Sequence, residues 1–344
     1  MGNSSDEIWM TRALELAIQG KSKTQPNPMV GCVIVLDEEI IAEGYHQKHG
    51  GPHAEVEALN NCRHNDLSRA TAYVTLEPCS HFGLTPPCAN LLIEKGIGRV
   101  ITAMEDPNPK VLGRGHEVLA SKGIEVKSGV LEEQSKQMNR IFIHLQNSPL
   151  PYITLKWAQS VDGYMDPDTK PEYKRGSIAI SSPESSEIVQ SLRSHHNAIL
   201  VGRKTVEVDD PRLTSREENG VDPIKIVLDS ECSLDLSDYR FSKVGRSIVV
   251  CNSGNSTTAV EYCVGLEKGL EPVLLKLRDM GVYSILVEGG AHTLNSFIDT
   301  GLWNEAYVLE SSNKLEGGLK APVIDLSGFD KTITDTDTIY HCIR

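Results

Sequence analysis

The sequence predicts two α/β domains joined by a short linker. The chain has 344 residues, which suits two domains of ordinary size that each bury a full core. Short strand-like apolar runs alternate with helical patterns along both halves, which is typical of sheets covered by helices. The segment Asn147-Ser148-Pro149-Leu150-Pro151 interrupts every regular pattern and is the best linker candidate. We therefore expect one domain over residues 1–147 and another over residues 152–344.

In the first domain, start and stop signals define the expected elements. Ser5 is expected to cap a helix, apolar residues recur at helical spacing after it, and Gly20 ends it. Strands over 30–36 and 40–45 are joined by the acidic turn 37–39. The pattern then predicts helices over 55–61, 89–95, 116–121 and 134–146, and strands over 72–76 and 100–104.

The second domain is expected to begin at Tyr152. Its sequence lacks a Gly-x-Gly-x-x-Gly turn after an early strand, which argues against a Rossmann dinucleotide domain. The predicted strands are 152–157, 198–201, 224–228, 247–250, 284–287 and 306–309, and the predicted helices are 183–194, 272–280 and 292–300.

Composition narrows the possible partners. The formal net charge is −13, whereas binding to a nucleic-acid backbone usually needs a basic face. No apolar run approaches the ~20 residues of a membrane helix, and the polar, acidic N-terminus does not resemble a secretory signal. Eight cysteines spread through a large chain are typical of a reduced cytoplasm. We expect a cytoplasmic protein that acts on small molecules and binds neither nucleic acid nor membrane.

His53, Glu55, Cys79 and Cys88 carry the strongest chemical signal. One imidazole and two thiolates can bind zinc at three corners of a tetrahedron and leave the fourth for water. A glutamate two residues after the histidine is placed to move protons without being a ligand, as in zinc-dependent nucleobase deaminases. The alternative is a buried histidine with two unrelated thiols. The match of four residue types at once, with Pro78 before the first thiolate, favours the zinc site.

A hydrolytic mechanism follows from these four residues. Zinc lowers the pKa of its bound water towards ~7, so that hydroxide can attack the ring carbon that carries the amine. Glu55 can then protonate the leaving nitrogen. Eight residues separate Cys79 from Cys88, where the common deaminase spacing is Cys-x-x-Cys. We expect this insert to form an extra wall of the substrate pocket.

The motif around these thiols resembles one known family. Thr-Leu-Glu-Pro-Cys-Ser-His-Phe-Gly at 75–83 and Thr-Pro-Pro-Cys at 85–88 are similar to the deaminase domain of the bifunctional riboflavin-biosynthesis deaminase-reductases. Further segments that support the resemblance are Pro26-Asn27-Pro28, Gly44-Tyr45-His46 and Asp106-Pro107-Asn108-Pro109. The resemblance implies a cytidine-deaminase-like three-layer domain, with His53, Cys79 and Cys88 as zinc ligands and Glu55 as the proton carrier.

The same resemblance assigns three residues to the deaminase substrate. Asn27, His46 and Asn108 match family positions near the pyrimidine and its ribose phosphate. Asn27 and Asn108 also have a simpler interpretation as turn residues next to proline. Both roles can hold at once, so the sequence leaves them open.

The second half resembles the dihydrofolate-reductase-like reductase domain of this family. The matching segments are 156–163, 197–216 and Val287-Glu288-Gly289-Gly290. The glycine pair lies before a predicted helix, so that backbone amides could approach a phosphate. The resemblance implies a cofactor site for NADPH formed by Ala158, Thr205, Asp209, Ser230, Gly290, Ala291, His292, Thr293, Leu294, Asn295 and Ser296. It implies a substrate site formed by Lys156, Ser177, Arg193, Leu213, Arg216 and Glu288.

Two of these assignments compete with plainer ones. Arginine binds phosphate with two hydrogen bonds, so Arg193 and Arg216 suit the terminal phosphate of the substrate. Arg193 could instead lie on a solvated helix face. Asp209 could be a turn residue before Pro211.

Together the two halves imply consecutive enzymes of riboflavin synthesis. The first would deaminate 2,5-diamino-6-(5-phosphoribosylamino)pyrimidin-4(3H)-one. The second would use NADPH to reduce the ribose of 5-amino-6-(5-phosphoribosylamino)uracil to the ribityl product. The resemblance also implies a homodimer or larger assembly.

Two departures from the family pattern leave room for different functions. Leu84 stands where the family usually has a cation, for which Lys48 or Lys110 could substitute, and Ile178-Ala179-Ile180-Ser181 replaces a tryptophan-containing run. One domain could therefore be inactive. The chain could also be a nucleic-acid-editing deaminase, against which the acidic charge speaks. A structural zinc module is a further possibility, but such a module would have no use for Glu55.

Overall fold

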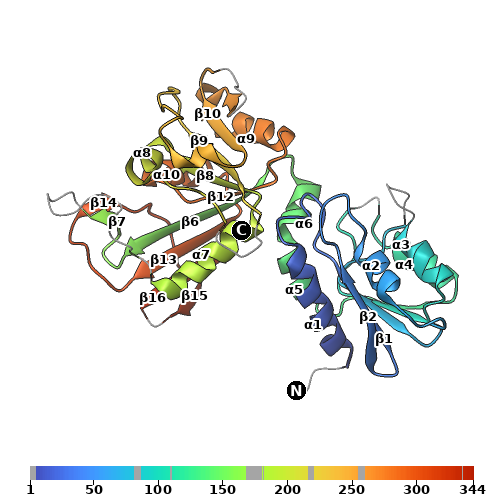
Figure 1. Ribbon diagram of the computed structural model, residues 1–344. Coiled ribbons are helices and arrows are strands. Elements are labelled where there is room, and N and C mark those ends of the chain that lie inside the picture. Colours follow the sequence, from blue (N-terminus) through green and yellow to red (C-terminus); the bar gives the residue numbers. More distant parts are fainter. Residues whose placement is uncertain are drawn as a thin grey trace. The chain divides into compact units, whose positions relative to one another are not determined.

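A computed structural model of the chain describes residues 5–344 except 81–86, 109–110, 168–179, 181, 216–220, 255–259 and 335. The chain divides into two compact units, Met1–Asn147 and Ser148–Arg344. The first unit runs from blue to green in Figure 1 and the second from green to red. Within the described residues, no helix combines the length and the apolar character needed to cross a membrane.

The first unit is built on a mixed sheet. Its described strands lie in the order β2-β1-β3-β4-β5, with β1 antiparallel to both neighbours and β3, β4 and β5 mutually parallel. The elements of this unit are α1 (Ser5–Ala17), η1 (Ile18–Gly20), β1 (Gly31–Leu36), β2 (Glu39–Tyr45), α2 (Ala54–Asn61), β3 (Thr71–Val74), α3 (Cys88–Glu94), β4 (Arg99–Thr102), α4 (Arg114–Ser121), β5 (Glu125–Lys127), α5 (Glu132–Met138) and α6 (Arg140–Asn147).

Strand β1 shows why this sheet has helices on both faces. Successive side chains of a strand point to opposite faces. Cys32 and Ile34 belong to a core cluster that includes buried residues of α2, α3 and α4, whereas Val33 and Val35 pack in a second cluster with α1. The unit therefore has three layers, and Figure 1 shows α1 and α2 on opposite sides of the sheet.

The second unit contains a larger sheet. Its described strands lie in the order β11-β10-β9-β8-β12-β6-β13-β16-β15, parallel from β11 to β13 and antiparallel at β16 and β15. The elements are β6 (Tyr152–Ser160), β7 (Tyr164–Pro167), α7 (Pro183–His195), β8 (Ala198–Gly202), α8 (Arg203–Asp209), β9 (Ile224–Leu228), η2 (Arg240–Lys243), β10 (Ser247–Cys251), β11 (Glu261–Val264), η3 (Leu266–Lys268), α9 (Leu270–Asp279), β12 (Ser284–Val287), α10 (Ala291–Thr300), β13 (Glu305–Ser311), β14 (Gly318–Lys320), β15 (Asp330–Ile333) and β16 (Asp337–Ile343).

Both faces of this parallel sheet are covered as well. Leu274 of α9 and Phe297 of α10 pack into one core cluster, and Leu192 of α7 and Val206 of α8 into another. Strands buried on both faces are typically continuous apolar runs, and β8 is buried along its whole length. The α/β fold class predicted for both halves is confirmed.

The predicted elements differ from the structure in two ways. The single helix expected over 134–146 is two helices, α5 and α6, because Asn139 leaves the helical path between them. Its buried side chain accepts a hydrogen bond from the Met29 N–H at 2.8 Å and donates one to the Met29 carbonyl at 3.0 Å. The prediction also omitted the elements β5, β7, α8, η2, β11, η3, β14, β15 and β16.

Candidate active sites

Three side chains from separate elements meet at one point in the first unit. His53 immediately precedes α2, Cys79 follows β3, and Cys88 is the first residue of α3. His53 Nδ1 lies 3.6 Å from Cys79 Sγ and 3.3 Å from Cys88 Sγ. Within the described part of the chain, these residues form the only group of three or more His, Cys, Asp or Glu residues whose potential ligand atoms all lie within 4.8 Å of one another.

The donor set fits zinc. One imidazole nitrogen and two sulfurs are the ligands of a three-residue catalytic zinc site that keeps one position open. Hydrogen bonds from Cys88 hold the pKa of the Cys79 thiol well below its usual value, and His53 acts in the same direction. The Cys88 backbone N–H donates to Cys79 Sγ at 3.2 Å. The contact with Cys79 and burial raise the pKa of the Cys88 thiol, so without a metal the environment favours the metal-binding thiolate form at Cys79.

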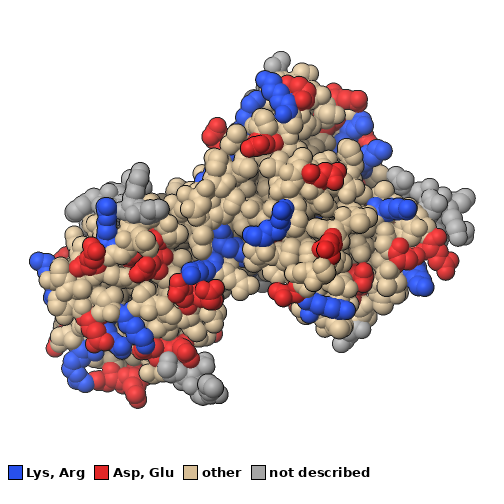
Figure 2. All heavy atoms as spheres, turned by 180° about the vertical axis from the view of Figure 1, so that it is seen from behind, with Lys and Arg blue, Asp and Glu red and all other residues tan. Residues whose placement is uncertain are grey.

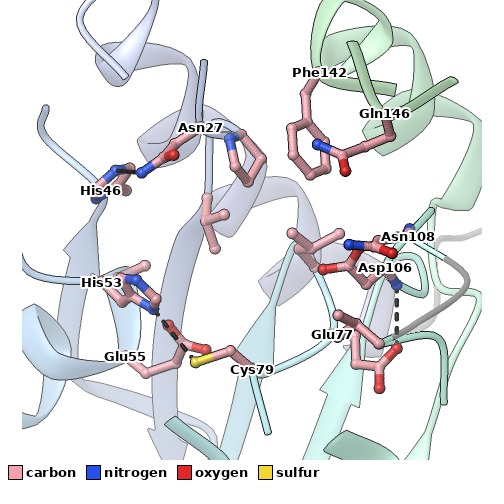
Figure 3. Close-up of a pocket in the computed structure, with 15 residues that line it drawn as sticks. Asn27, His46, His53, Glu55, Glu77, Cys79, Asp106, Asn108, Phe142 and Gln146 are labelled. Carbon is pink, nitrogen blue, oxygen red and sulfur yellow. Dashed lines mark hydrogen bonds between the residues drawn. The ribbon is translucent and has the colours of Figure 1, made fainter. Parts of the chain in front are cut away.

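Glu55 lies beside these residues in the first turn of α2. Its side chain is buried, and burial together with the nearby Cys79 sulfur raises the pKa of Glu55 to about 7. Figure 3 shows Glu55 next to His53 and Cys79 at the floor of a pocket. A carboxyl group that titrates near neutrality can both accept and donate a proton, as general acid–base catalysis requires.

A cavity of about 270 Å³ opens above this floor. Each residue that the sequence associated with the deaminase substrate lies on its wall, together with several that it did not. The lining residues are Asn27, Pro28, Val30, His46, His53, Ala54, Glu55, Leu76, Glu77, Cys79, Asp106, Asn108, Val111, Phe142 and Gln146.

Asn27 and His46 form a fixed pair on the wall. His46 Nδ1 lies 2.8 Å from the Pro52 carbonyl oxygen, so this nitrogen carries the proton. His46 Nε2 is then the acceptor for the Asn27 side-chain amide at 3.3 Å. Burial lowers the pKa of His46, which favours this neutral form. The Asn27 backbone N–H also closes a turn onto the Thr24 carbonyl, so the turn is present alongside the place in the cavity.

The sequence assigned no role to nine of the wall residues, among them Glu77, Asp106, Phe142 and Gln146. Glu77 and Asp106 are part of the segments that carried the resemblance, so a signal for them existed. Phe142 and Gln146 lie one turn apart on α6 and face the cavity (Figure 3). No motif marks these two residues, because their place depends on how α6 packs on the rest of the unit.

In the second unit, Arg193 of α7 contacts Glu288, which follows β12. Two parallel bonds join Arg193 Nε to Glu288 Oε1 at 2.9 Å and Nη2 to Oε2 at 2.5 Å. Burial acts to raise the pKa of Glu288, but the bonds and charge of Arg193 outweigh it, and the pKa lies below its usual value. The guanidinium is thus held by a carboxylate and does not lie on a solvated helix face.

Lys156 of β6 lies within electrostatic reach of this pair. Burial lowers the pKa of the Lys156 ammonium, and Glu288 opposes that change. The proximity follows from the register, because β12 pairs with β6 through Val287 and Leu155. Three of the predicted substrate residues therefore form one charged cluster.

The predicted cofactor residues gather at one edge of the sheet. Strands β9, β8, β12 and β6 are adjacent and parallel, and Ser230, Thr205, Gly290 and Ala158 lie at or beyond their carboxyl ends. Ligands of open parallel sheets bind at this edge. Gly290 has φ 76° and precedes α10, and a Cβ added to it would lie 3.3 Å from Thr205 Oγ1. Because Gly290 has no side chain, the backbone at the N-terminus of α10 can come close to a nucleotide phosphate.

The other described residues predicted for this half differ in their exposure and position. Leu213 and Leu294 are buried in the hydrophobic core, so any contact with a ligand would involve their backbone. Asp209 is exposed at the end of α8. The remaining predicted residues of α10 follow Gly290 in its first two turns: Ala291, His292, Thr293, Asn295 and Ser296.

Several predictions fall outside the described residues. These concern the substrate residues Ser177 and Arg216 and the departures at Leu84, Ile178, Ala179 and Ser181. Lys110, one of two cations that could replace the one missing at Leu84, is also outside. The second cation, Lys48, is exposed.

Both units match known protein families. The cytidine and deoxycytidylate deaminase zinc-binding region matches residues 3–104, and the RibD C-terminal domain matches residues 151–341. The riboflavin biosynthesis protein RibD of Actinobacillus pleuropneumoniae is 39% identical, with 92% of this chain and 86% of the relative covered. RibD of Escherichia coli K12 is 38% identical, with 95% and 92% covered.

A solved structure is similar over almost the whole length. It is a diaminohydroxyphosphoribosylaminopyrimidine deaminase/5-amino-6-(5-phosphoribosylamino)uracil reductase from Thermotoga maritima. The two chains are 35% identical, with a TM-score of 0.88 and 98% of each chain covered.

Proposed function

This chain belongs to the RibD family of riboflavin biosynthesis proteins, and on that premise we propose that it catalyses two consecutive reactions on one phosphorylated pyrimidine. The first unit, residues 1–147, would deaminate 2,5-diamino-6-(5-phosphoribosylamino)pyrimidin-4(3H)-one. The second unit, which contains the predicted domain 152–344, would reduce the ribose of the resulting 5-amino-6-(5-phosphoribosylamino)uracil. The observation that supports the first reaction most strongly is the cluster of His53, Cys79 and Cys88 with Glu55 buried beside it.

In the deaminase, His53, Cys79 and Cys88 would hold a zinc ion. Zinc supplies a Lewis acid that lowers the pKa of a bound water to about 7. Glu55 would take a proton from the attacking water and deliver it to the departing amine, for which its pKa of about 7 is suited. Asn27 and Asn108 would orient the pyrimidine with their side-chain amides.

The reductase would use NADPH, which supplies a hydride. Lys156 and Glu288 would bind the substrate beside the cofactor. The backbone N–H groups around Gly290 would donate to a cofactor phosphate at the start of α10. Arg193 would act first by fixing the Glu288 carboxylate, because its Nε and Nη2 are already bonded to the two carboxylate oxygens. The contribution of this unit is orientation and exclusion of water from the hydride path.

We also propose the compartment, the class of substrate and the oligomeric state of the enzyme. All eight cysteines lie in the described part of the chain and none is in a disulfide. That pattern supports a reduced compartment, the cytoplasm. Lys, Arg, Asp and Glu side chains are interspersed among the described residues on the face shown in Figure 2, which suits small-molecule substrates more than a nucleic-acid backbone. The family resemblance supports a homodimer or larger assembly, which sedimentation analysis would test.

One assay tests both activities. The purified protein would receive the diaminopyrimidine substrate with and without NADPH. We expect ammonia release without NADPH, and NADPH oxidation only once the deaminated product is present. Ammonia release without any later NADPH oxidation would mean that only the deaminase is active. NADPH oxidation that occurs only with pre-formed product would mean that only the reductase is active.

A further inference from the structure

The side chain of Glu77 is buried beside the deaminase cavity and binds three backbone N–H groups. Its Oε2 accepts from Asp106 N at 3.1 Å and from Gly113 N at 2.9 Å, and its Oε1 accepts from Gly115 N at 2.7 Å. Figure 3 shows its contact with the Asp106 segment. Glu77 is 3% exposed, so these bonds are shielded from water. Both carboxylate oxygens are engaged, although Glu77 is also part of the cavity wall.

These three bonds fix the segment between β4 and α4 at both of its ends. Asp106 lies near its beginning, and Gly113 and Gly115 are the cap and the second residue of α4. A carboxylate at a helix N-terminus satisfies unpaired N–H groups and interacts favourably with the helix dipole. The close approach requires glycine, because a Cβ on Gly115 would lie 2.0 Å from the Pro78 carbonyl oxygen.

Asn108 is carried by this segment. Its backbone N–H donates to Asp106 Oδ1 at 2.8 Å, and its carbonyl accepts from Val111 N at 2.8 Å and Leu112 N at 2.9 Å. Asn108 and Val111 both line the cavity. Glu77 itself lies two residues before Cys79 along the chain. One side chain therefore links the segment that carries a metal ligand with the segment that carries a substrate-contacting amide.

We propose that Glu77 is a positioning residue of the deaminase. It fixes the position of Asn108 in the cavity wall relative to the zinc ligands, so that the side-chain amide of Asn108 can contact the substrate. This inference rests on the proposed function, because it assigns a role within the same reaction. It accounts for a glutamate at this position where glutamine would not serve. A carboxylate accepts from all three N–H groups, whereas a carboxamide must turn its NH₂ towards at least one of them.

The test is a double-mutant cycle on ammonia release. Glu77→Gln, Asn108→Ala and the double variant would be assayed for kcat, KM and zinc content. Thermal unfolding of each variant measures whether the first unit is folded, and the reductase rate with pre-formed deaminated product checks the second unit. We expect Glu77→Gln to raise KM about ten- to hundredfold while zinc stays at one per chain. Asn108→Ala should give a similar rise, and the double variant should be no worse than Asn108→Ala alone, because both changes remove one interaction.

Two further variants separate positioning from general stability. Glu77→Asp keeps the charge and both acceptor oxygens, so it should recover part of the KM lost in Glu77→Gln. Asp6→Asn removes another buried carboxylate of the same unit, which binds Tyr73 and Lys127 away from the cavity, and should leave KM unchanged.

Each outcome supports or overturns this role of Glu77. Effects of Glu77→Gln and Asn108→Ala that multiply in the double variant would overturn the proposal, as would zinc loss in Glu77→Gln or a rise in KM for Asp6→Asn. If Glu77→Gln does not fold, the same cycle with Glu77→Asp applies, and additivity there would overturn the proposal equally. An unaltered protein that binds zinc and releases no ammonia would reject the proposed function itself, and the role of Glu77 with it.

Discussion

Arg193 and Glu288 are 95 residues apart in the sequence and form a two-bond ion pair in the second unit. The side chains are 17% and 8% exposed. A pair so shielded is strongly destabilised when one partner is removed, because the remaining charge stays buried without compensation. Arg246 and Glu261 make the same two-bond contact at the surface, with side chains 38% and 41% exposed, and provide a matched comparison.

The first prediction compares these two pairs. Glu288→Gln should lower the free energy of unfolding of the second unit by about 3 kcal/mol at pH 7. Glu261→Gln should lower it by less than about 1 kcal/mol, because water and salt screen the exposed pair. Denaturant unfolding followed by the fluorescence of Trp157 and Trp303 measures both. Equal losses in the two variants would refute the role of burial.

The second prediction concerns the pH dependence of the same pair. The pKa of Glu288 is lowered in the folded protein, so the pair stabilises the fold above the unfolded pKa of about 4.3 and loses this effect as pH falls through the lower folded value. The stability difference between the unaltered protein and Glu288→Gln should therefore be constant near neutrality and shrink below about pH 4. A difference that grows on acidification would contradict the ion pair.

The third prediction tests Glu55 as the proton carrier. Glu55→Gln keeps the size of the side chain and removes the carboxyl group, so ammonia release should fall at least about a hundredfold. Zinc content and NADPH oxidation with pre-formed product should not change, because Glu55 is not a ligand and lies in the first unit. Glu57→Gln, on the same helix but not on the cavity wall, is the control and should retain activity. Full activity of Glu55→Gln would exclude the mechanism.

The fourth prediction separates zinc from the reductase. Cys88→Ser replaces a thiolate ligand with a weaker donor, so zinc should drop below one per chain and ammonia release should be lost. NADPH oxidation with the deaminated product should persist. Metal analysis and the two rates, measured on one preparation, test this separation. Loss of both rates with normal folding would show that the metal serves the second unit too.

The fifth prediction concerns Gly290. Its φ of 76° and ψ of 130° belong to a region that side chains disfavour, and a Cβ there would approach Thr205. Gly290→Ala should therefore raise the KM for NADPH about tenfold or more and leave ammonia release intact. Gly301→Ala, at the other end of α10 with φ 67°, strains the same helix without altering the proposed phosphate site. A similar KM for NADPH in both variants would show that Gly290 is not part of the cofactor site.

Chemistry carried by short motifs could be predicted from the sequence. The residues His53, Glu55, Cys79 and Cys88 were identified by type and spacing, and the structure places them together. The α/β character of both halves followed from the alternation of apolar runs. What could not be predicted depends on contacts between distant residues.

Asn139, Arg193 and β16 illustrate those contacts. The break between α5 and α6 arises where Asn139 bonds to Met29, 110 residues earlier. Arg193 was assigned to a phosphate because its partner Glu288 is distant in the sequence. Strand β16 exists through its pairing with β13, and its half-buried pattern gave little local signal. Phe142 and Gln146 reach the cavity through the packing of α6, which no motif encodes.

The most direct test of the two-step reaction follows ammonia and NADPH together in one mixture of the diaminopyrimidine substrate and zinc-loaded protein. We predict that one ammonia is released for each NADPH oxidised and that ammonia appears first. Glu55→Gln should abolish both signals, and added deaminated product should restore NADPH oxidation alone. NADPH oxidation that proceeds without ammonia release, or ammonia release that persists in Glu55→Gln, would contradict the proposed sequence of reactions.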